Sequence, residues 1–555
     1  MEISDNDLCM LEQLTYLDKD VLKEAGISNM SYKRFSKSKD NSLSTFLNQF
    51  TDASLDKLAS NKDNEIGGSH MKGSEWAGII RYLKSKYTGG ANDLYLTDVH
   101  ENKDKTPLAL CFTKTKDSKE AIVAFKGTSG GEEWADNVQG FNQNDTACQR
   151  DALEYIQSLP YTDITVTGHS KGGNKAMYVA ITSDKVTRCL AMDAQGFSQE
   201  FIDKYWAEIQ QRGKNITNFS LSVDYVHALM FQIPNSNQVY FEGFDLYDAA
   251  QFHCPNAYFK IDEDGNIVLE NGEIAMRRVN MDSDDIKFLH NFTTFVLNNA
   301  DDKDKKLIVD FLSRVAPILM CDPKNEKGLK QAIGDNPEAL AAILAYLAKY
   351  MQTYDLGEDD IYSLLRTLKM GFAQSKLFAK FANMLKRQLS DDNNDWITKY
   401  ILSALKHFFA DDVDIDVDDV WNMAQEKQKH ISSVQSSTAK LKDGRTYDYS
   451  LVAYQAAMTT INSIEHIGNV LVNTWDQYAD REWHSALFIS GFEQVIDTYF
   501  DNLSASDSDS KQKIVNAFND VSNADVTCGT KVDAYNTDIR TITDGITQLC
   551  NYINV

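Results

Sequence analysis

Up to about residue 295, short apolar runs alternate with segments whose apolar residues recur every three or four positions. Helical segments such as 145–159 and 174–182 fall between the apolar runs. Six apolar runs are candidate strands: 107–114, 121–128, 163–170, 188–197, 216–223 and 256–262. Strands that alternate with helices indicate a mostly parallel α/β sheet with helices on both faces.

Beyond about residue 300 the pattern is almost entirely helical. Asn336 is a candidate N-cap, with Pro337 at the first helical position. One apolar stripe with helical spacing runs from Leu451 to Tyr478, and a second helical run follows the polar segment "LSASDSDSKQ". We interpret the acidic run 410–419 as a solvated linker. The predicted domains are an α/β domain over 1–295, a helical connecting region over 296–420 and a helical hairpin over 421–555.

The chain is acidic, with a formal net charge of −25 at pH 7. That charge repels phosphate, so we expect no nucleic acid partner. The eight cysteines form no Cys-x-x-Cys pair, and no zinc or other metal site is predicted. Cys111 and Cys189 lie in apolar runs, which is typical of buried thiols in a protein folded in a reducing compartment.

Two further features bear on localisation. The N-terminal stretch "MEISDNDLCMLEQL" has neither the basic start nor the apolar core of a secretory signal. The most apolar run, 339–348, is about half as long as a bilayer span requires. We expect a chain that is soluble when made, and any export would use a route without an N-terminal signal.

The pentapeptide Gly168-His169-Ser170-Lys171-Gly172 has the Gly-x-Ser-x-Gly pattern of a nucleophile elbow. A β-branched run precedes it and a helix-forming run follows it. Such a strand–turn–helix context lifts a serine hydroxyl above the sheet. Ser170 is therefore the candidate nucleophile, although a glycine-rich turn without chemistry is the alternative.

A serine nucleophile needs a base, and in a hydrolase of this kind the order along the chain is serine, acid, histidine. Three histidines follow Ser170 before the helical region. His290 lies in a helical pattern and His227 is only three residues after a candidate acid, so both are less suitable. We predict His253 as the base, on a loop that precedes a strand.

The acid and the oxyanion hole also have candidates. Asp224 and Asp193 each follow a strand-like run; Asp224 is the preferred acid and Asp193 the alternative. The backbone N–H of Lys171, directly after the nucleophile, is one expected oxyanion donor. Thr128, in the loop after the strand at 121–128, is the other.

At these residues the sequence resembles the class 3-type lipases and a bacterial lipase-like branch of the α/β hydrolases. "AFKGTSGGEEWADN" resembles their Phe-Arg-Gly-Thr segment with Lys126 in place of arginine, and "VTGHSKGGNKA" resembles their elbow. In "MDAQGF", Gln195 stands where that branch has proline. The resemblance implies an α/β-hydrolase fold and a triad of Ser170, Asp224 and His253, with no cofactor.

The order of a hydrolase followed by a helical hairpin resembles lipase toxins exported by the type VII secretion system. That resemblance implies an LXG-like targeting domain, small helical WXG-like partners and an immunity protein. No Leu-x-Gly occurs in the chain; Ile489-Ser-Gly491 is the nearest match, and Tyr478 with Glu482 resembles the export signal. The one Trp-x-Gly, at Trp76, lies in the α/β part.

The sequence therefore predicts a serine acyl hydrolase of the phospholipase A or lipase type, acting on membrane glycerolipids and secreted as an antibacterial or virulence toxin. One alternative is an intracellular esterase or thioesterase whose helical half serves oligomerisation. Another is a non-catalytic interaction protein that retains the elbow. The apolar segment 228–252 is either a lid or acyl groove, or an ordinary inserted helix and loop.

Overall fold

The computed structural model divides the chain into two compact units, Met1–Val434 and Gln435–Val555. It describes residues 3–387, 416–431, 438–440 and 446–448, with gaps in the first range at 28–29, 63, 68, 70, 116, 129–135, 142, 245–248, 263–264, 280–282, 322–327, 329–330, 333, 368–378 and 381. The hairpin expected beyond residue 450 lies outside the described residues. The three-part division of the chain therefore stays a prediction.

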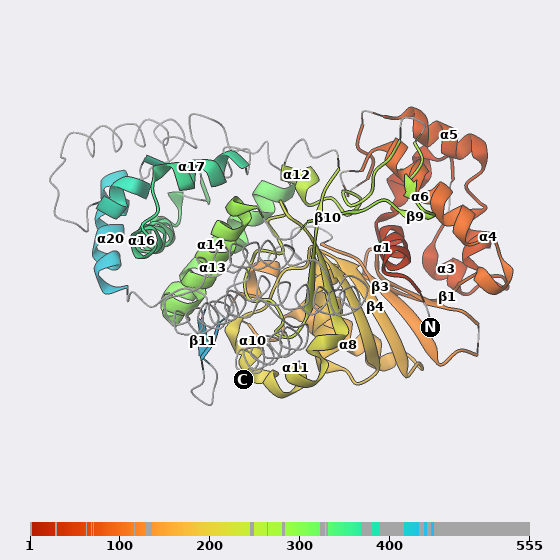
Figure 1. The fold of residues 1–555 in the computed structure, drawn as a ribbon, viewed down its shortest axis with the longest axis horizontal. Coiled ribbons are helices and arrows are strands. Elements are labelled where there is room, and N and C mark those ends of the chain that lie inside the picture. The colour runs from red at the N-terminus through yellow and green to blue at the C-terminus, as the bar shows by residue number, and fades with distance from the viewer. Residues whose placement is uncertain are drawn as a thin grey trace, which may run out of the picture. The chain divides into compact units, whose positions relative to one another are not determined.

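An eight-stranded sheet forms the centre of the first unit (Figure 1). Its strands, in spatial order, are β1 (Tyr95–Glu101), β2 (Pro107–Thr113), β3 (Glu120–Phe125), β4 (Asp163–His169), β5 (Val186–Met192), β6 (Ile216–Leu221), β7 (Asn237–Glu242) and β10 (Arg277–Val279). All pairs from β3 to β7 are parallel, whereas β1–β2, β2–β3 and β7–β10 are antiparallel. The predicted, mostly parallel sheet is confirmed.

Helices cover both faces of this sheet, as predicted. The parallel strands lie side by side in chain order, so right-handed crossovers place their connecting helices on one face. These helices are α8 (Ala147–Ser158), α9 (Lys171–Thr182), α10 (Gln199–Lys204) and α11 (Trp206–Arg212). On the other face, α1 (Asp5–Gln13) packs against β3, β4 and β5 (Figure 1).

The N-terminal segment contributes most of the second helical layer, which the sequence pattern had not indicated. After α1 come α2 (Lys19–Glu24), α3 (Tyr32–Ser36), α4 (Leu43–Leu47), α5 (Asp52–Ser60) and α6 (Gly73–Lys86), with short 3-10 segments at Leu14–Tyr16, Gly90–Asn92 and later Gly213–Asn215. Leu11 and Trp76 belong to the same buried cluster as Leu190 and Met192 of β5. This layer therefore closes the core on the face that the crossover helices leave open.

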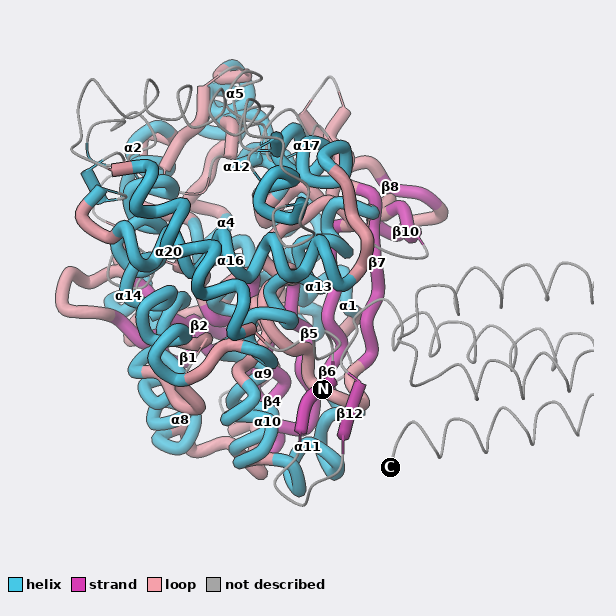
Figure 2. The backbone as a smooth tube through the Cα atoms, turned by 90° about the vertical axis from the view of Figure 1, so that its left-hand side faces the viewer, coloured by secondary structure: helices cyan, strands magenta, loops and turns pink. Residues whose placement is uncertain are grey.

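The later helices of the first unit are α12 (Ala249–Phe252), α13 (Asp284–Asn299), α14 (Asp302–Cys321), α16 (Pro337–Thr353), α17 (Glu358–Thr367) and α20 (Val417–His430). α16 packs against α13, α14 and α20, and Figure 2 shows these helices as one group. As predicted, α16 begins at Pro337 after Asn336. None of the described helices is both long enough and apolar enough to cross a bilayer.

One expectation about local structure was wrong, and two others need a finer description. Residues 255–258 form consecutive turns where a strand was predicted over 256–262, because the N–H groups of Ala257 and Phe259 bond to carbonyls three residues earlier. Segment 228–252 contains β7, so part of it belongs to the sheet. Of the predicted solvated linker 410–419, only 416–419 lie among the described residues; 417–419 open α20, and Asp416 caps that helix by accepting the N–H groups of Asp418 and Asp419.

The remaining strands form two small antiparallel pairs, β8 (Leu269–Glu270) with β9 (Glu273–Ile274) and β11 (Thr438–Lys440) with β12 (Thr446–Asp448). Five cysteines of the described part of the chain are outside any disulfide: Cys9, Cys111, Cys148, Cys189 and Cys254. Cys111 and Cys189 lie in β2 and β5 and are buried, as expected from their apolar runs. Burial raises the pKa of Cys111 to about 12.

Candidate active site

Ser170 occupies a sharp turn between the end of β4 and the start of α9. Its backbone has φ of 59° and ψ of −125°, a conformation that costs a non-glycine residue about 1–3 kcal/mol. The turn is held by a hydrogen bond from the N–H of Ser170 to the carbonyl of Met192, 2.8 Å long. The Ser170 side chain makes no capping bond to α9, so its hydroxyl faces away from the helix.

Close backbone packing around this turn explains the glycine after it. A Cβ on Gly172 would lie 2.2 Å from the carbonyl oxygen of Phe125, at the end of β3. No side chain can therefore occupy position 172 without displacing the β3 backbone from α9. The sequence pattern Gly-x-Ser-x-Gly is a packing requirement here, independent of any chemistry.

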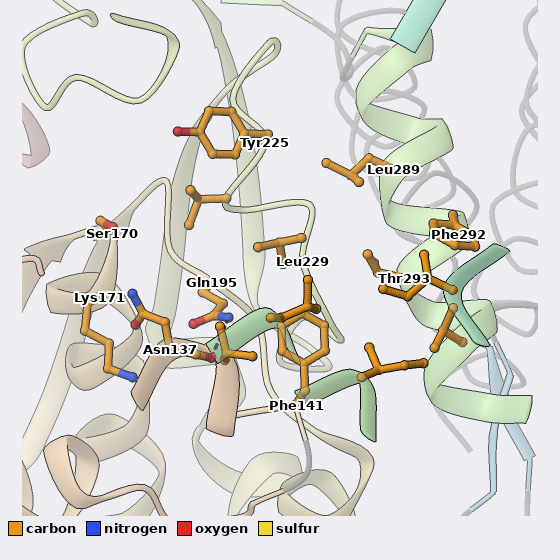
Figure 3. A pocket seen from close by; sticks show the side chains of 16 residues that line it. Asn137, Phe141, Ser170, Lys171, Gln195, Tyr225, Leu229, Leu289, Phe292 and Thr293 are labelled. Atoms are coloured by element: carbon orange, nitrogen blue, oxygen red, sulfur yellow. Dashed lines mark hydrogen bonds between the residues drawn. The ribbon is translucent and has the colours of Figure 1, made fainter. Parts of the chain in front are cut away.

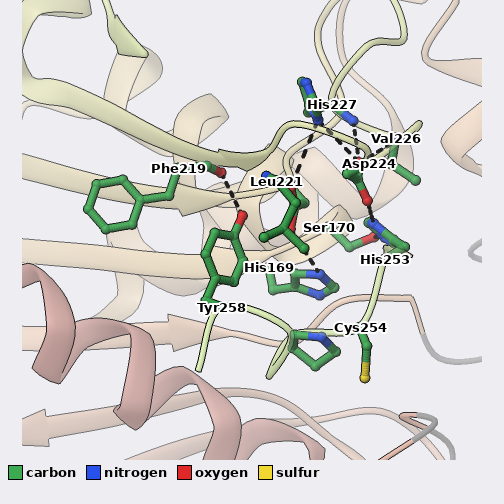
Figure 4. Close-up of polar contacts among 12 residues, drawn as sticks. His169, Ser170, Phe219, Leu221, Asp224, Val226, His227, His253, Cys254 and Tyr258 are labelled. Carbon is green, nitrogen blue, oxygen red and sulfur yellow. Dashed lines mark hydrogen bonds and ion pairs between the residues drawn. The ribbon is translucent and has the colours of Figure 1, made fainter. Parts of the chain in front are cut away.

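His253 lies on a short loop after α12 and reaches Ser170 (Figure 4). Its Nε2 is 2.7 Å from the Oγ of Ser170, and its Nδ1 is hydrogen-bonded to Oδ2 of Asp224. A carboxylate can only accept, so Nδ1 carries the proton and Nε2 is free to accept from the serine hydroxyl. The structure thus brings together the three residues Ser170, His253 and Asp224.

Asp224 follows the end of β6 and is fully buried. Its Oδ1 accepts the N–H groups of Val226 at 2.7 Å and His227 at 3.0 Å. Burial raises the pKa of Asp224, but the positive potential of His253 and the hydrogen bonds from His227 and His253 outweigh burial and lower that pKa below its ordinary value. Asp224 is therefore ionised at neutral pH.

Asp193, the alternative acid, has a different position. Its Oδ1 accepts the N–H of Leu221 at 2.8 Å, which ties the end of β5 to β6. Burial raises the pKa of Asp193 well above its ordinary value, and the Asp224 carboxylate raises it further. Two carboxylates that share a buried site cannot both ionise easily, so Asp193 is the member of the pair that holds its proton more strongly.

His227 is a residue whose contribution the sequence analysis missed. It is buried, and its Nδ1 lies 3.3 Å from Oδ1 of Asp224. The side chain therefore orients the acid that contacts His253. Ligand atoms of Asp193, Asp224 and His227 lie within 4.8 Å of one another, an arrangement that could hold a metal ion among the described residues. The hydrogen bonds to Asp224 account for the same arrangement.

A second buried histidine, His169, lies directly below this group. Its Nδ1 is 2.8 Å from the hydroxyl of Tyr16, and its ring centroid is 4.7 Å from that of His253. Burial lowers the pKa of His169 well below its ordinary value, and the neighbouring His253 lowers it further. His169 is thus neutral and supports the elbow from the side of the N-terminal helices.

The predicted oxyanion residues lie on either side of the elbow. Lys171 is the first residue of α9, where backbone N–H groups have no partner within the helix. Thr128 lies in the loop after β3. This loop runs close to the turn at Ser170, because a Cβ on the neighbouring Gly127 would lie 3.1 Å from the carbonyl oxygen of His169. The Thr128 hydroxyl oxygen accepts a hydrogen bond of 3.0 Å from the side chain of Asn137.

A polar network anchors this loop to the rest of the site. Gln195 donates from Nε2 to the carbonyl of Asn137 at 3.0 Å, and its own carbonyl accepts from Asn174 of α9 at 3.1 Å. The sequence analysis gave Gln195 no role in the site. Its side chain holds Asn137, which in turn contacts Thr128, so this position links α9 to the loop that carries Thr128.

The side chain of Lys171 forms a buried ion pair. Its Nζ lies 2.6 Å from Oδ2 of Asp136, and the two side chains are 1% and 7% exposed. Burial raises the pKa of Asp136, but the Lys171 ammonium and hydrogen bonds outweigh it and leave that pKa below its ordinary value. The ion pair thus fastens the residue after Ser170 to the segment that follows the loop carrying Thr128.

An apolar cavity of about 360 Å³ begins at Ser170 (Figure 3). Near the serine its wall includes Lys171, Asn137 and Gln195. Farther away it is lined by Phe141 and Leu229 and by residues of α13, α14 and α16. Because Ser170 follows the last residue of β4, the cavity lies at the carboxyl end of the parallel strands, where α/β sheets bind ligands.

The other sequence hypotheses about this region have mixed outcomes. His290 is a buried residue of α13 whose Nδ1 lies 3.0 Å from the carbonyl of Ala228, as expected for an ordinary helix residue. Of segment 228–252, Leu229 lines the cavity whereas Tyr240 and Phe241 are buried residues of β7. The segment is therefore partly sheet and only partly cavity wall.

Comparison with known proteins gives one match. A family model named Mbeg1-like matches residues 92–239, a range that spans β1 to β6 and includes Ser170 and Asp224 but not His253. No curated protein matches the chain, and no solved structure matches it. The α/β part of the chain is thus similar to the Mbeg1-like family over this range.

Proposed function

We propose that this protein is a serine acyl hydrolase, with Ser170 as nucleophile, His253 as general base and Asp224 as the acid that orients the base. The observation that carries the proposal is the continuous hydrogen-bonded series from Ser170 through His253 to Asp224. The strained backbone of Ser170 at a strand–turn–helix junction supports it, because this geometry exposes a nucleophile at the top of a sheet.

The reaction would proceed in two halves. Nε2 of His253 takes the proton as Oγ of Ser170 attacks the ester carbonyl, and then returns it to the leaving alcohol. Asp224 remains ionised, holds the Nδ1 proton in place and stabilises the imidazolium. The N–H groups at Lys171 and Thr128 stabilise the developing oxyanion, and water then releases the acyl group by the same steps.

The cavity favours an acyl substrate with a hydrocarbon chain. Its lining is almost entirely apolar, and its polar residues are concentrated beside Ser170. A carbonyl at Ser170 would thus have its alkyl chain directed into apolar surroundings. We propose glycerolipid esters of the phospholipase A or lipase type as the substrates, on an α/β-hydrolase fold of the class 3 lipase-like kind.

Two parts of the proposal rest on sequence resemblance alone. One is export by the type VII system as a toxin, with an LXG-like domain over 421–555, helical WXG-like partners and an immunity protein. The other is the hairpin form of that domain, most of which lies outside the described residues. These features would explain the helical C-terminal pattern, and copurification with small helical proteins from the producing cell would test them.

The hydrolase itself is tested by incubating purified protein with phosphatidylcholine and phosphatidylglycerol vesicles and resolving the products by mass spectrometry, with Ser170→Ala as control. Fatty acid and lysophospholipid from the wild type alone would support a phospholipase. Cleavage of short soluble esters without lipid turnover would favour a small-acyl esterase or thioesterase. No hydrolysis of either class would favour the interaction protein.

A further inference from the structure

The cavity beside Ser170 has an unusual wall. Residues of three helices that follow the sheet, α13, α14 and α16, form the side away from the serine. These residues are Leu289, Phe292, Thr293, Val296, Ile308, Leu312 and Ile343. In Figure 3, Leu289, Phe292 and Thr293 project from α13 across the cavity from Ser170. The helical region therefore shares one ligand-sized space with the candidate nucleophile.

Polar groups are distributed unevenly in this cavity. Ser170, Lys171, Asn137 and Gln195 lie together at one end. At the other end Thr293 is the single polar residue of the helical wall, and its hydroxyl donates within the protein toward the carbonyls of His290 and Ala228. The space thus matches a ligand with one polar head at Ser170 and an apolar tail among the helices.

The helical wall is attached to the sheet domain at several points. Nδ1 of His290 contacts the carbonyl of Ala228 at 3.0 Å, and the N–H of Ser283 donates to the carbonyl of Ser222 at 2.8 Å. Lys305 of α14 pairs with Glu200 of α10 at 3.8 Å. These contacts fix the position of the helical wall relative to Ser170. A wall that limits the length of a bound chain needs such a fixed position.

The volume limits what the cavity can hold. At 360 Å³ it lies near the lower end of ligand pockets, which span about 300–1,000 Å³. A pocket of this size suits one acyl chain of medium length better than the two chains of a diacyl lipid.

We infer that the cavity binds one acyl chain of medium length and that α13, α14 and α16 set the length accepted at Ser170. The inference rests on the proposed function and specifies its substrate: an ester with one medium-length acyl chain in the cavity and its alcohol portion outside. The first part of the helical region is then a component of the substrate site, in addition to connecting the sheet with the C-terminal unit.

The test compares kcat/KM for p-nitrophenyl butanoate, dodecanoate and hexadecanoate. Ile343→Trp fills the helical end of the cavity, Phe292→Ala enlarges it, and Gln352→Trp places the same indole at an exposed position of α16 as a matched control. Wild type and control should prefer dodecanoate. Ile343→Trp should lower the dodecanoate-to-butanoate ratio at least about tenfold, and Phe292→Ala should raise the hexadecanoate-to-dodecanoate ratio by a similar factor.

A binding measurement separates this inference from the proposed function. Dodecanoate should raise the Tm of full-length Ser170→Ala, and the added Ile343→Trp change should abolish the rise. If butanoate is cleaved but both variants keep the wild-type ratios, the acyl-chain inference is overturned and the hydrolase stands. If no ester is cleaved while dodecanoate still stabilises the protein in this cavity-dependent way, the chain site stands and the hydrolase fails.

Discussion

Nε2 of His253 lies 2.7 Å from Oγ of Ser170, although 83 residues separate the two along the chain. The serine is placed by the end of β4 and the histidine by a loop after α12, so the contact depends on the complete sheet between them. Asp224, after β6, joins the pair from a third position. This convergence of three segments underlies the predictions below.

The two candidate acids can be distinguished by matched substitutions. Asp224→Asn should lower kcat about 10⁴-fold, because the amide favours the wrong His253 tautomer. Asp193→Asn alters an equally buried aspartate that contacts Leu221 and whose pKa is raised, so its effect on kcat should be less than about tenfold. Ester hydrolysis by both variants, with circular dichroism to verify folding, decides the assignment; equal losses would contradict it.

His227 should act as a positioning residue. His227→Gln removes the ring that contacts Oδ1 of Asp224 while the backbone N–H to the same oxygen remains. We expect kcat to fall about 10- to 100-fold with KM nearly unchanged, because a hydrogen bond to a charged group contributes about 1.5–3 kcal/mol. Steady-state kinetics check this, and a change confined to KM would argue against a role through Asp224.

His169 should make stability depend on pH. Its pKa is lowered in the folded protein, so the unfolded chain binds the proton more readily below about pH 6.5. Stability is therefore present above that pH and is lost as the pH falls, by up to about 1.4 kcal/mol per pH unit. Denaturant unfolding of wild type and His169→Asn between pH 5 and 7.5 tests this; parallel curves would refute the assignment.

The elbow glycine should be indispensable for packing. Gly172→Ala places a Cβ 2.2 Å from the carbonyl oxygen of Phe125, so α9 must move away from β3. We expect a loss of several kcal/mol in unfolding free energy, within the range of severe core overpacking and broken backbone contacts. Gly357→Ala, where the nearest atom would be at an ordinary 3.7 Å, should change stability little and serves as the control.

Much of the sheet could be predicted because its central strands are short apolar runs bounded by polar residues. β2 to β6 all fall within or beside the predicted runs. β7 was missed because half of its sequence, NQVYFE, is polar and because it lies inside a segment that was interpreted as a lid or acyl groove, or as an inserted helix and loop. The run 256–262 was predicted as a strand because buried turns and buried strands have similar apolar composition.

The residues of the candidate site also fall into two groups, those that the sequence indicates and those that it does not. Ser170, Asp224 and His253, which the structure brings together, could be proposed from local motifs and chain order, since the chemistry requires those residue types in a set sequence. His227 and Gln195 could not, because their contacts depend on side-chain positions across segments that no local pattern links. The helical wall of the cavity could not be predicted either, because its apolar residues in α13, α14 and α16 have the spacing of ordinary core residues.

The most direct test of the central claim is labelling of the full-length protein with a fluorophosphonate, followed by peptide mass spectrometry to locate the adduct. The account predicts stoichiometric modification at Ser170, none in Ser170→Ala, and a rate reduced at least about 10³-fold in His253→Gln, because the probe requires a base-activated serine. Absence of labelling in the folded wild type, or equal labelling of His253→Gln, would contradict it.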